Sequence, residues 1–194
     1  MAISNSGSIV AVGMINGTLQ AFNYSENAQG KIAFKTIKAR RDRKGKAIQI
    51  IKFSPDDSIC AVGGHDSQII LYNSAQSFAP IKRIRSHHST VTHIDFTQDG
   101  SAIMSNCTSY EILFHNTGNG KQITGGASMY KNEPWATWSC TLGWPVQGIW
   151  PPCADGSDIN CCERSPDGSV IATGDDFRTV KLFRYPCPVD EAAG

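Results

Sequence analysis

Seven cysteines and five histidines are the residues of this chain most able to do chemistry, and their spacing decides whether they form a site. Cys140, Cys153, Cys161 and Cys162 lie close together, but no histidine lies near them in the sequence. None therefore has a nearby general base in the sequence to activate its thiol. Cysteines in strands are more often small buried hydrophobic residues, which is the interpretation we favour.

The histidines and cysteines also lack the spacing of a metal site. His87, His88 and His93 have no cysteine or carboxylate at ligand spacing, and there is no Cys-x-x-Cys pair. An odd cysteine count with Cys161 and Cys162 adjacent argues against a disulfide framework and favours a reducing, cytoplasmic setting. Phosphate-binding glycine motifs are absent too. We predict no cofactor, no metal and no enzyme activity.

Residues 31–46 concentrate basic charge, with eight lysines and arginines against one acid, Asp42. Such a stretch could hold an acidic polymer surface by screened attraction, or it could be a solvated loop between two repeats. Its single aromatic residue, Phe34, is too little for base stacking, so we predict no nucleic-acid partner. The candidate partner-binding residues are Lys38, Arg40, Arg41, Arg43, Lys44 and Lys46.

Over the whole chain, charge is balanced. The 194 residues carry 18 basic and 17 acidic side chains, a net charge of +1, and 40% of them are hydrophobic. No apolar run approaches the roughly 18 residues that span a bilayer, and the N-terminal residues do not resemble a signal peptide. These values are typical of a globular domain without a membrane partner.

The elements that position these residues follow from an internal repeat. A polar turn recurs four times, each time followed by a small-apolar run and then by a second run that ends in an aromatic residue. The interval from the turn to that aromatic is identical in three repeats (7 to 22, 57 to 72 and 168 to 183) and shorter by a single position in the other (100 to 114). The aromatic residues are Phe22, Tyr72, Phe114 and Phe183.

Each repeat therefore predicts two short strands joined by a tight turn, with a third strand before them. Near-continuous apolar runs indicate strands covered on both faces, which is typical of propeller blades. No segment keeps a helical apolar period, so we expect almost no helix. The predicted strands lie near 8–13, 18–24, 47–53, 58–64, 68–74, 91–96, 101–106, 110–115, 169–174 and 179–184.

The fold predicted is all-β, a partial WD-repeat β-propeller of about four blades in an open arc. It occupies residues 1–187, with blades near 1–24, 30–74, 80–116 and 121–187, and a tail at 188–194. His87 occupies the loop position of a WD-repeat histidine, while Asn16, Asp66 and Asp176 lie in or beside turns between strands. We expect these four to make hydrogen bonds inside the blades and not to bind metal or act in catalysis.

All four tryptophans lie in one short stretch, between Trp135 and Trp150. Together with the segment that follows as far as Cys187, this stretch closely resembles the second propeller of the echinoderm microtubule-associated protein-like family, especially its long members with tandem propeller pairs. The resemblance covers essentially the whole chain. It implies a cytoplasmic, cytoskeletal protein that binds tubulin and microtubules and influences their assembly. We expect the tryptophan-rich segment to pack on the propeller, with a partner-binding platform as the alternative.

The chain departs from the family pattern at both ends. We expect the first blade to lack its first strand and the chain to stop before a closing blade, as in a fragment or truncated product. Such an arc would leave two open sheet edges, which invite pairing or aggregation.

Three functions follow from these observations. The first is a non-catalytic, microtubule-binding cytoskeletal scaffold that modulates microtubule assembly. The second is a general WD-repeat adaptor that binds other proteins through its propeller faces without touching tubulin. The third is a hydrolase or thiol enzyme built on the same fold.

Overall fold

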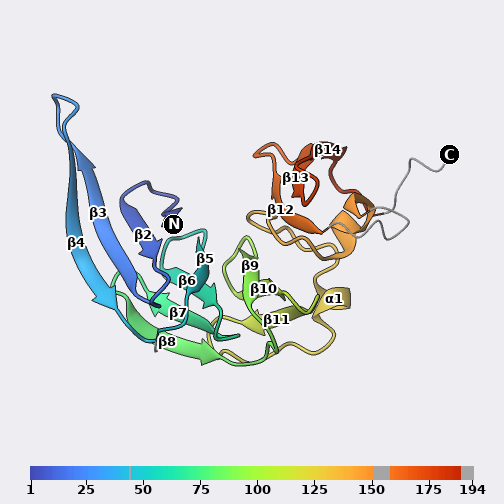
Figure 1. Ribbon diagram of the computed structural model, residues 1–194, viewed down its shortest axis with the longest axis horizontal. Coiled ribbons are helices and arrows are strands. Elements are labelled where there is room, and N and C mark those ends of the chain that lie inside the picture. The colour runs from blue at the N-terminus through green and yellow to red at the C-terminus, as the bar shows by residue number, and fades with distance from the viewer. Residues whose placement is uncertain (44, 151–157, 189–194) are drawn as a thin grey trace.

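The computed structural model describes residues 1–43, 45–150 and 158–188, which form four antiparallel sheets (Figure 1). Blade one contains β1 (Ala2–Ile3), β2 (Ile9–Gly13), β3 (Leu19–Glu26) and β4 (Ile32–Arg40). Blade two contains β5 (Ile48–Phe53), β6 (Ile59–Gly64), β7 (Ile69–Asn73) and β8 (Ala79–Ile84). Blade three contains β9 (Val91–Phe96), β10 (Ala102–Cys107) and β11 (Ile112–Asn116). Blade four contains β12 (Ile159–Arg164), β13 (Val170–Asp175) and β14 (Val180–Arg184).

The four blades stand side by side in an open arc, which confirms the predicted partial propeller (Figure 1). In every blade, strands that follow one another in sequence are neighbours in the sheet. The first strands of the blades, β1, β5, β9 and β12, together line a cavity of about 680 Å³ on the inner side of the arc. All ten predicted strands are present, with ends that differ by at most two residues.

Burial differs between the middle and the ends of the arc. All of β10 and nearly all of β6 are buried, because blades two and three are covered on both faces. In blade four, β14 is exposed along most of its length, including Val180 and Leu182. The continuous apolar runs in the sequence thus correspond to sheets covered on both faces, while the end sheets leave one face open.

The recurring polar turn has the same geometry in all four blades. The backbone N–H of Gly7, Asp57, Gly100 and Gly168 donates to the carbonyl three residues earlier, at 2.9 Å each time. These four residues have φ between 59° and 71°, where glycine has no steric penalty. Asp57 is the exception, and its carboxylate accepts backbone N–H bonds from Asn5 (2.7 Å) and Ser6 (2.8 Å), so this turn fastens blade one to blade two.

Close packing between blades two and three depends on a small residue in β6. A Cβ atom placed on Gly63 would lie 2.7 Å from side-chain carbons of Ile50 in β5 and Val91 in β9. Real Cβ atoms do not approach other carbons so closely, so a larger residue here would force the inner strands apart.

Helix is confined to two short segments of the described chain, α1 (Gly126–Met129) and the 3-10 turn η1 (Trp144–Ile149), as expected from the absence of a helical period. None of the described helices has the length and apolar character needed to cross a membrane. Both segments belong to residues 117–150, a long connection between blades three and four that we call the insert.

Two expectations about the strands need correction. Blade one does contain an innermost strand, because Ala2 and Ile3 pair with Ala11 and Val10 of β2. Beyond β1, the strands β4, β8 and β12 were also missing from the predicted set. β4 and β8 are outer strands; most residues of β4 and half of those of β8 are exposed, so neither strand has a continuous apolar run. The expected tail lies, apart from Pro188, outside the described residues.

Candidate functional site

The basic stretch begins on a long hairpin. β3 and β4 pair from Leu19 and Arg40 to Glu26 and Ile32, and their hairpin extends well beyond the rest of blade one (Figure 1). The expectation of a loop is therefore wrong for residues 32–40, and the described loop residues are 41–43 and 45–47. Along this hairpin and loop the described exposed cations are Lys31, Lys35, Lys38, Arg41 and Lys46.

The hairpin also exposes aromatic and aliphatic surface. Phe34 is 59% exposed, and its ring packs edge-on against Phe22 at 6.3 Å and lies 5.9 Å from the ring of Tyr24. Ile32 is exposed on the same strand. Because neighbouring residues of a strand point to opposite faces, Lys35 lies on the face opposite Phe34. The hairpin thus offers cations on one face and an aromatic cluster on the other.

Arg43 was expected to be an exposed partner-binding residue, and the structure contradicts this. Its side chain is 1% exposed, pairs with the Asp66 carboxylate and donates to the carbonyl oxygens of Val62 and Gln68. Burial lowers the pKa of Arg43, and the neighbouring Asp66 opposes that shift. A buried cation needs such partners, since an unpaired one is costly. Arg43 therefore stabilises blade two and is not exposed for a partner to contact.

Arg40 is also engaged in the fold. Its guanidinium donates to the carbonyl oxygens of Phe78 (2.9 Å) and Ser77 (3.3 Å), linking the outer strand of blade one to blade two. The one acid of the stretch, Asp42, accepts a hydrogen bond from the Tyr72 hydroxyl at 3.0 Å. Lys44 lies outside the described residues. Of the six predicted contact residues, Lys38, Arg41 and Lys46 remain as exposed cations.

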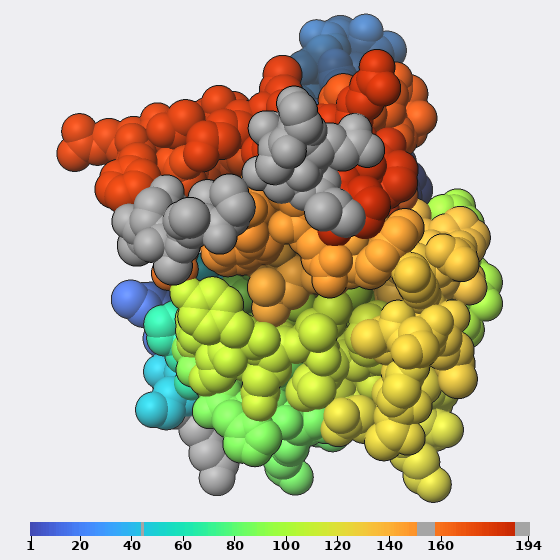
Figure 2. Space-filling view, turned by 90° about the vertical axis from the view of Figure 1, so that its right-hand side faces the viewer, coloured from blue at the N-terminus to red at the C-terminus, as the bar shows by residue number. Residues whose placement is uncertain are grey.

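The tryptophan-rich insert packs between blades three and four, as favoured from the sequence. Figure 2 shows its residues, yellow to orange, covering the side of the molecule between these blades. Trp135 and Trp138 are almost fully buried, and their rings meet edge-on at 6.1 Å. The indole N–H of Trp138 donates to the Cys140 carbonyl and that of Trp150 to the Thr141 carbonyl, each at 2.8 Å.

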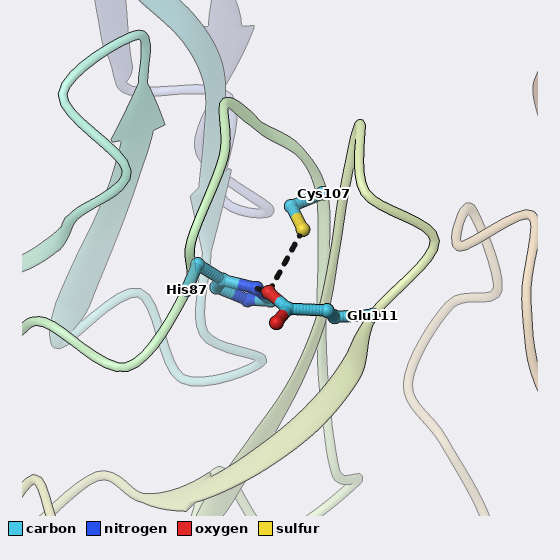
Figure 3. A group of neighbouring side chains, drawn as sticks. All are labelled: His87, Cys107 and Glu111. Atoms are coloured by element: carbon cyan, nitrogen blue, oxygen red, sulfur yellow. Dashed lines mark hydrogen bonds and ion pairs between the residues drawn. The ribbon is translucent and has the colours of Figure 1, made fainter.

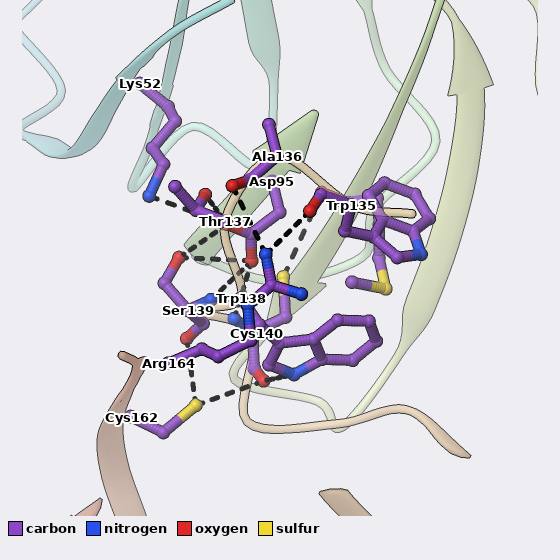
Figure 4. A network of polar contacts seen from close by, with 11 residues as sticks. Lys52, Asp95, Trp135, Ala136, Thr137, Trp138, Ser139, Cys140, Cys162 and Arg164 are labelled. Carbon is purple, nitrogen blue, oxygen red and sulfur yellow. Dashed lines mark hydrogen bonds and ion pairs between the residues drawn. The ribbon is translucent and has the colours of Figure 1, made fainter. Parts of the chain in front are cut away.

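One buried carboxylate holds the insert in place (Figure 4). Asp95 of β9 is fully buried and accepts hydrogen bonds from the Thr137 hydroxyl (2.6 Å) and from the backbone N–H groups of Ser139 (2.7 Å) and Cys140 (2.8 Å). The Lys52 ammonium, from β5, lies 3.5 Å away and balances the charge. A buried carboxylate with this many donors fixes the backbone of residues 137–140.

The insert also encloses a pocket of about 350 Å³ against blade three, with an aromatic wall. Among its lining residues are Phe114, Tyr130, Trp135, Trp138 and Trp144. The Lys131 ammonium lies 4.6 Å from the centre of the Trp144 ring. Trp144 and Trp150 are only partly buried, so the partner-platform interpretation stays a prediction for this part of the insert.

The residues assigned to hydrogen bonds inside the blades make them. Asn16 and Asp66 each accept the backbone N–H two residues later, and Asp176 accepts from the Asn160 amide at 2.6 Å. His87 has Nε2 2.7 Å from the Ser105 hydroxyl and Nδ1 3.3 Å from Glu111 (Figure 3). We call Arg43–Asp66 and His87–Glu111 the loop–turn pairs of blades two and three, because each joins the loop before a blade to a turn inside it.

Two pKa shifts accompany the blade-three pair. Burial lowers the pKa of His87, which favours a neutral ring. The backbone N–H of His88 is the largest cause that lowers the pKa of Glu111, to about 2, so Glu111 is a carboxylate at neutral pH. Cys107 also lies here, with Sγ 3.1 Å from Glu111, because the turn at Tyr110 brings the end of β10 beside the start of β11. That Cys107 and Glu111 join His87 was not predicted from the sequence.

Two of the four cysteines considered as nucleophiles are poorly placed for that role. Cys140 and Cys162 are buried, and burial raises the pKa of both thiols, which disfavours the reactive thiolate. Cys161 is exposed in β12, and Cys153 lies outside the described residues.

The arrangement of the blades defines a WD-repeat β-propeller. The C-terminal WD40 domain of Sif2 superimposes with a TM-score of 0.63 over 92% of this chain and 55% of that one, at 13% identity. Sqt1 from Chaetomium thermophilum gives a TM-score of 0.58 over 94% and 44%, at 19% identity. At these identities the likeness concerns the fold alone.

The particular family follows from the sequence comparison. The family described as "Echinoderm microtubule-associated protein second beta-propeller" matches residues 1–194, and this chain belongs to it. Echinoderm microtubule-associated protein-like 2 of Rattus norvegicus is 38% identical over 94% of the chain, and the 77 kDa echinoderm microtubule-associated protein of Lytechinus variegatus is 37% identical over 93%. The chain spans 27% and 26% of the length of these two relatives.

Proposed function

We propose that this chain is a non-catalytic, microtubule-binding scaffold of the cytoplasmic cytoskeleton that modulates microtubule assembly. The observation that carries the proposal is the projecting hairpin with Lys31, Lys35 and Lys38 exposed along it and Arg41 and Lys46 in the loop that follows. The exterior of a microtubule is rich in carboxylates, and clustered cations attract such a surface from a distance. The microtubule-associated names of the relatives support the same partner.

The contact we propose is mainly electrostatic. It should weaken steeply with added salt, because the Debye length falls from about 10 Å at 0.1 M to about 3 Å at 1 M. The chain as a whole is nearly neutral, so the proposal includes neither nucleic acid nor a membrane as partner.

A co-sedimentation assay with taxane-stabilised microtubules tests the proposal. Serine replaces Lys31, Lys35 and Lys38 in one variant and three exposed cations elsewhere, Arg85, Lys121 and Arg184, in the matched control. Both variants lose the same charge, so only a local contact separates them. We expect the hairpin variant to bind at least about tenfold more weakly than wild type, since each lost surface contact is worth a fraction of 1 kcal/mol or more. Equal binding by the two variants would remove the hairpin from the interface.

The second candidate is an adaptor that binds other proteins without direct tubulin contact. The exposed aromatic cluster of the hairpin and the aromatic pocket of the insert favour it, since aromatic residues are enriched at protein interfaces. Wild-type protein that stays in the supernatant at every salt concentration would favour the adaptor over the microtubule scaffold.

A further inference from the structure

Three side chains with metal-binding atoms meet at the edge of blade three, and a fourth, His88, lies beside them in contact with Glu111. His87 and His88 lie in the loop between β8 and β9, Cys107 ends β10, and Glu111 directly precedes β11. The ligand atoms of His87, Cys107 and Glu111 all lie within 4.8 Å of one another (Figure 3). The figure shows these three side chains pointing toward one another, and the described residues hold no other such group.

The spacing of these atoms matches a small coordination shell. The Glu111 carboxylate lies 3.1 Å from Cys107 Sγ and 3.3 Å from His87 Nδ1, and it also contacts His88 Nδ1. Zinc binds N and O atoms at about 2.0–2.2 Å and S at about 2.3 Å, so tetrahedral ligand atoms lie roughly 3.3–3.7 Å apart. The two distances from Glu111 are within a few tenths of an ångström of these values. The ligand atoms of His87 and Cys107 lie within 4.8 Å of each other, so they must approach somewhat, and the exposed His88 ring must turn to reach the same centre.

The hydrogen bonds of His87 leave its Nδ1 atom suited to a cation. Ser105 Oγ lies 2.7 Å from Nε2 and can donate its own proton to the Leu113 carbonyl at 3.4 Å. In that arrangement Nε2–H donates to Ser105, and the lone pair of Nδ1 points at the carboxylate of Glu111. In the other tautomer a proton on Nδ1 donates to Glu111, and a bound cation would take the place of that proton between the same two atoms. A histidine whose second nitrogen is held by a hydrogen bond is also the usual form of a metal ligand.

The two segments that supply the ligands are fastened to each other. The backbone N–H of Thr108 donates to the Thr90 carbonyl at 3.0 Å, and that of Tyr110 donates to the Cys107 carbonyl at 3.0 Å. The site is nevertheless open to solvent on one side, because the side chain of Glu111 is 25% exposed and that of His88 82% exposed. An ion can therefore enter without unfolding the blade.

We propose that His87, Cys107 and Glu111, with His88 as the fourth ligand, form a structural site for a divalent transition metal, with zinc the best match. Imidazole, thiolate and carboxylate ligands together suit zinc and exclude calcium or magnesium, which take oxygen ligands. The thiol of Cys107 releases its proton to solvent on binding, so one thiolate and one carboxylate neutralise the ion. The bound ion would fasten the loop before blade three to the turn inside it.

Cobalt and zinc titrations of chelator-treated protein test the site. We expect one Co²⁺ ion per chain to produce a thiolate-to-cobalt charge-transfer band and the visible bands of tetrahedral coordination, both removed by added Zn²⁺. Cys107→Ser should abolish the charge-transfer band and weaken zinc binding more than about tenfold. Mutation of a residue that only hydrogen-bonds to a metal ligand already lowers metal affinity about 10–100-fold. The matched control Cys161→Ser removes an exposed thiol outside the cluster and should bind as wild type does.

His88→Ala keeps the test decisive if Cys107→Ser fails to fold, because the exposed His88 ring contributes nothing to the core. It should leave the circular dichroism spectrum unchanged and weaken zinc binding more than about tenfold, as loss of a ligand requires. The proposal is overturned if wild-type protein takes up no saturable Co²⁺ or if the His88 variant binds zinc as tightly as wild type. In that event His87 Nδ1–H donates to Glu111 as a plain hydrogen bond.

Discussion

The loop–turn pairs of blades two and three have the same structural role but consist of different side chains. In blade two the Arg43 guanidinium reaches Asp66, and in blade three the His87 ring reaches Glu111. Both pairs connect the loop before a blade to an acid in the turn between its second and third strands. The arginine pair is nearly enclosed, whereas the histidine pair is open to solvent on the side of Glu111.

The strand beneath each pair explains the choice of side chain. Val62 of β6 and Ser105 of β10 are equivalent, because each lies equally far along the chain from its own turn residue (57 to 62 and 100 to 105). Ser105 offers a hydroxyl to His87, whereas Val62 has no polar side-chain atom and Arg43 reaches its carbonyl oxygen instead. In blade two, the long guanidinium of Arg43, with its several donors, thus takes the place of the His87 ring and the Ser105 hydroxyl of blade three.

Of the changes predicted here, removal of the Arg43 guanidinium should lower the free energy of unfolding most. Arg43→Met removes the donor to Asp66 and to the carbonyl oxygens of Val62 and Gln68, and loss of one partner of a buried pair costs about 3–5 kcal/mol. The matched control Arg41→Met changes an exposed neighbour and should cost less than about 0.5 kcal/mol. Urea unfolding followed by tryptophan fluorescence measures both. Equal midpoints for the two variants would contradict the burial of Arg43.

Removal of the histidine should cost less. His87→Leu keeps a similar side-chain volume but removes the imidazole that contacts Ser105 and the partly hydrated Glu111. This loss should cost about 1–3 kcal/mol. Urea unfolding in the presence of a chelator excludes any contribution from metal. His88→Ala is the control and should lie within about 0.5 kcal/mol of wild type under the same conditions. A loss for His87→Leu as large as for Arg43→Met would show that the two pairs do not differ in strength.

Acid should destabilise blade three through a second imidazole. Burial lowers the pKa of His115 from 6.5 to about 4, so the unfolded chain binds more protons between these values. Stability from this group is complete well above pH 6.5 and falls as the pH drops toward 4, by about 2 kcal/mol at pH 5. His115→Gln should flatten that slope in chelator-containing buffer, whereas the arginine of blade two keeps its proton throughout. An unchanged slope in urea unfolding from pH 7 to 5 would refute this assignment.

The smallest effect should come from the hairpin. Serine at Lys31, Lys35 and Lys38 removes exposed cations without a buried partner, so each change should matter by less than about 0.5 kcal/mol. Arg40→Ser, in the same strand, removes two hydrogen bonds to blade two and should cost about 1–3 kcal/mol. Thermal unfolding of both variants measures this contrast. If the triple variant were the less stable, the lysines would have a structural role that their exposure does not indicate.

The strands and turns of this protein were largely predictable, because covered sheets leave apolar runs and each turn needs a residue at positive φ. The outer strand β4 was missed because its residues are mostly exposed and its lysines suggested a loop. The hydrogen bonds of His87, Asp66, Asn16 and Asp176 followed from the repeat. Burial of Arg43 did not, since nothing in a run of cations marks the one that folds inward.

The cluster at Cys107 and Glu111 is a second feature that could not be predicted from the sequence. The two residues approach each other because the turn at Tyr110, with φ of 57°, brings the end of β10 beside the start of β11. His87 then arrives from the loop before β9, separated from Cys107 in the sequence by two whole strands. Such a group depends on pairing between strands, which residue spacing alone does not describe.

The buried carboxylate of Asp95 has a consequence for the order of folding. Its donors lie 42 to 45 residues further along the chain, so a long loop must close before they reach it. Blade three has only short-range pairings and can form first, whereas the insert docks afterwards, when residues 137–140 meet Asp95. Until then the carboxylate must stay hydrated, which holds the space between blades three and four open. We therefore expect tryptophan burial to be the late, slow step of folding, separable from formation of the sheets in stopped-flow experiments.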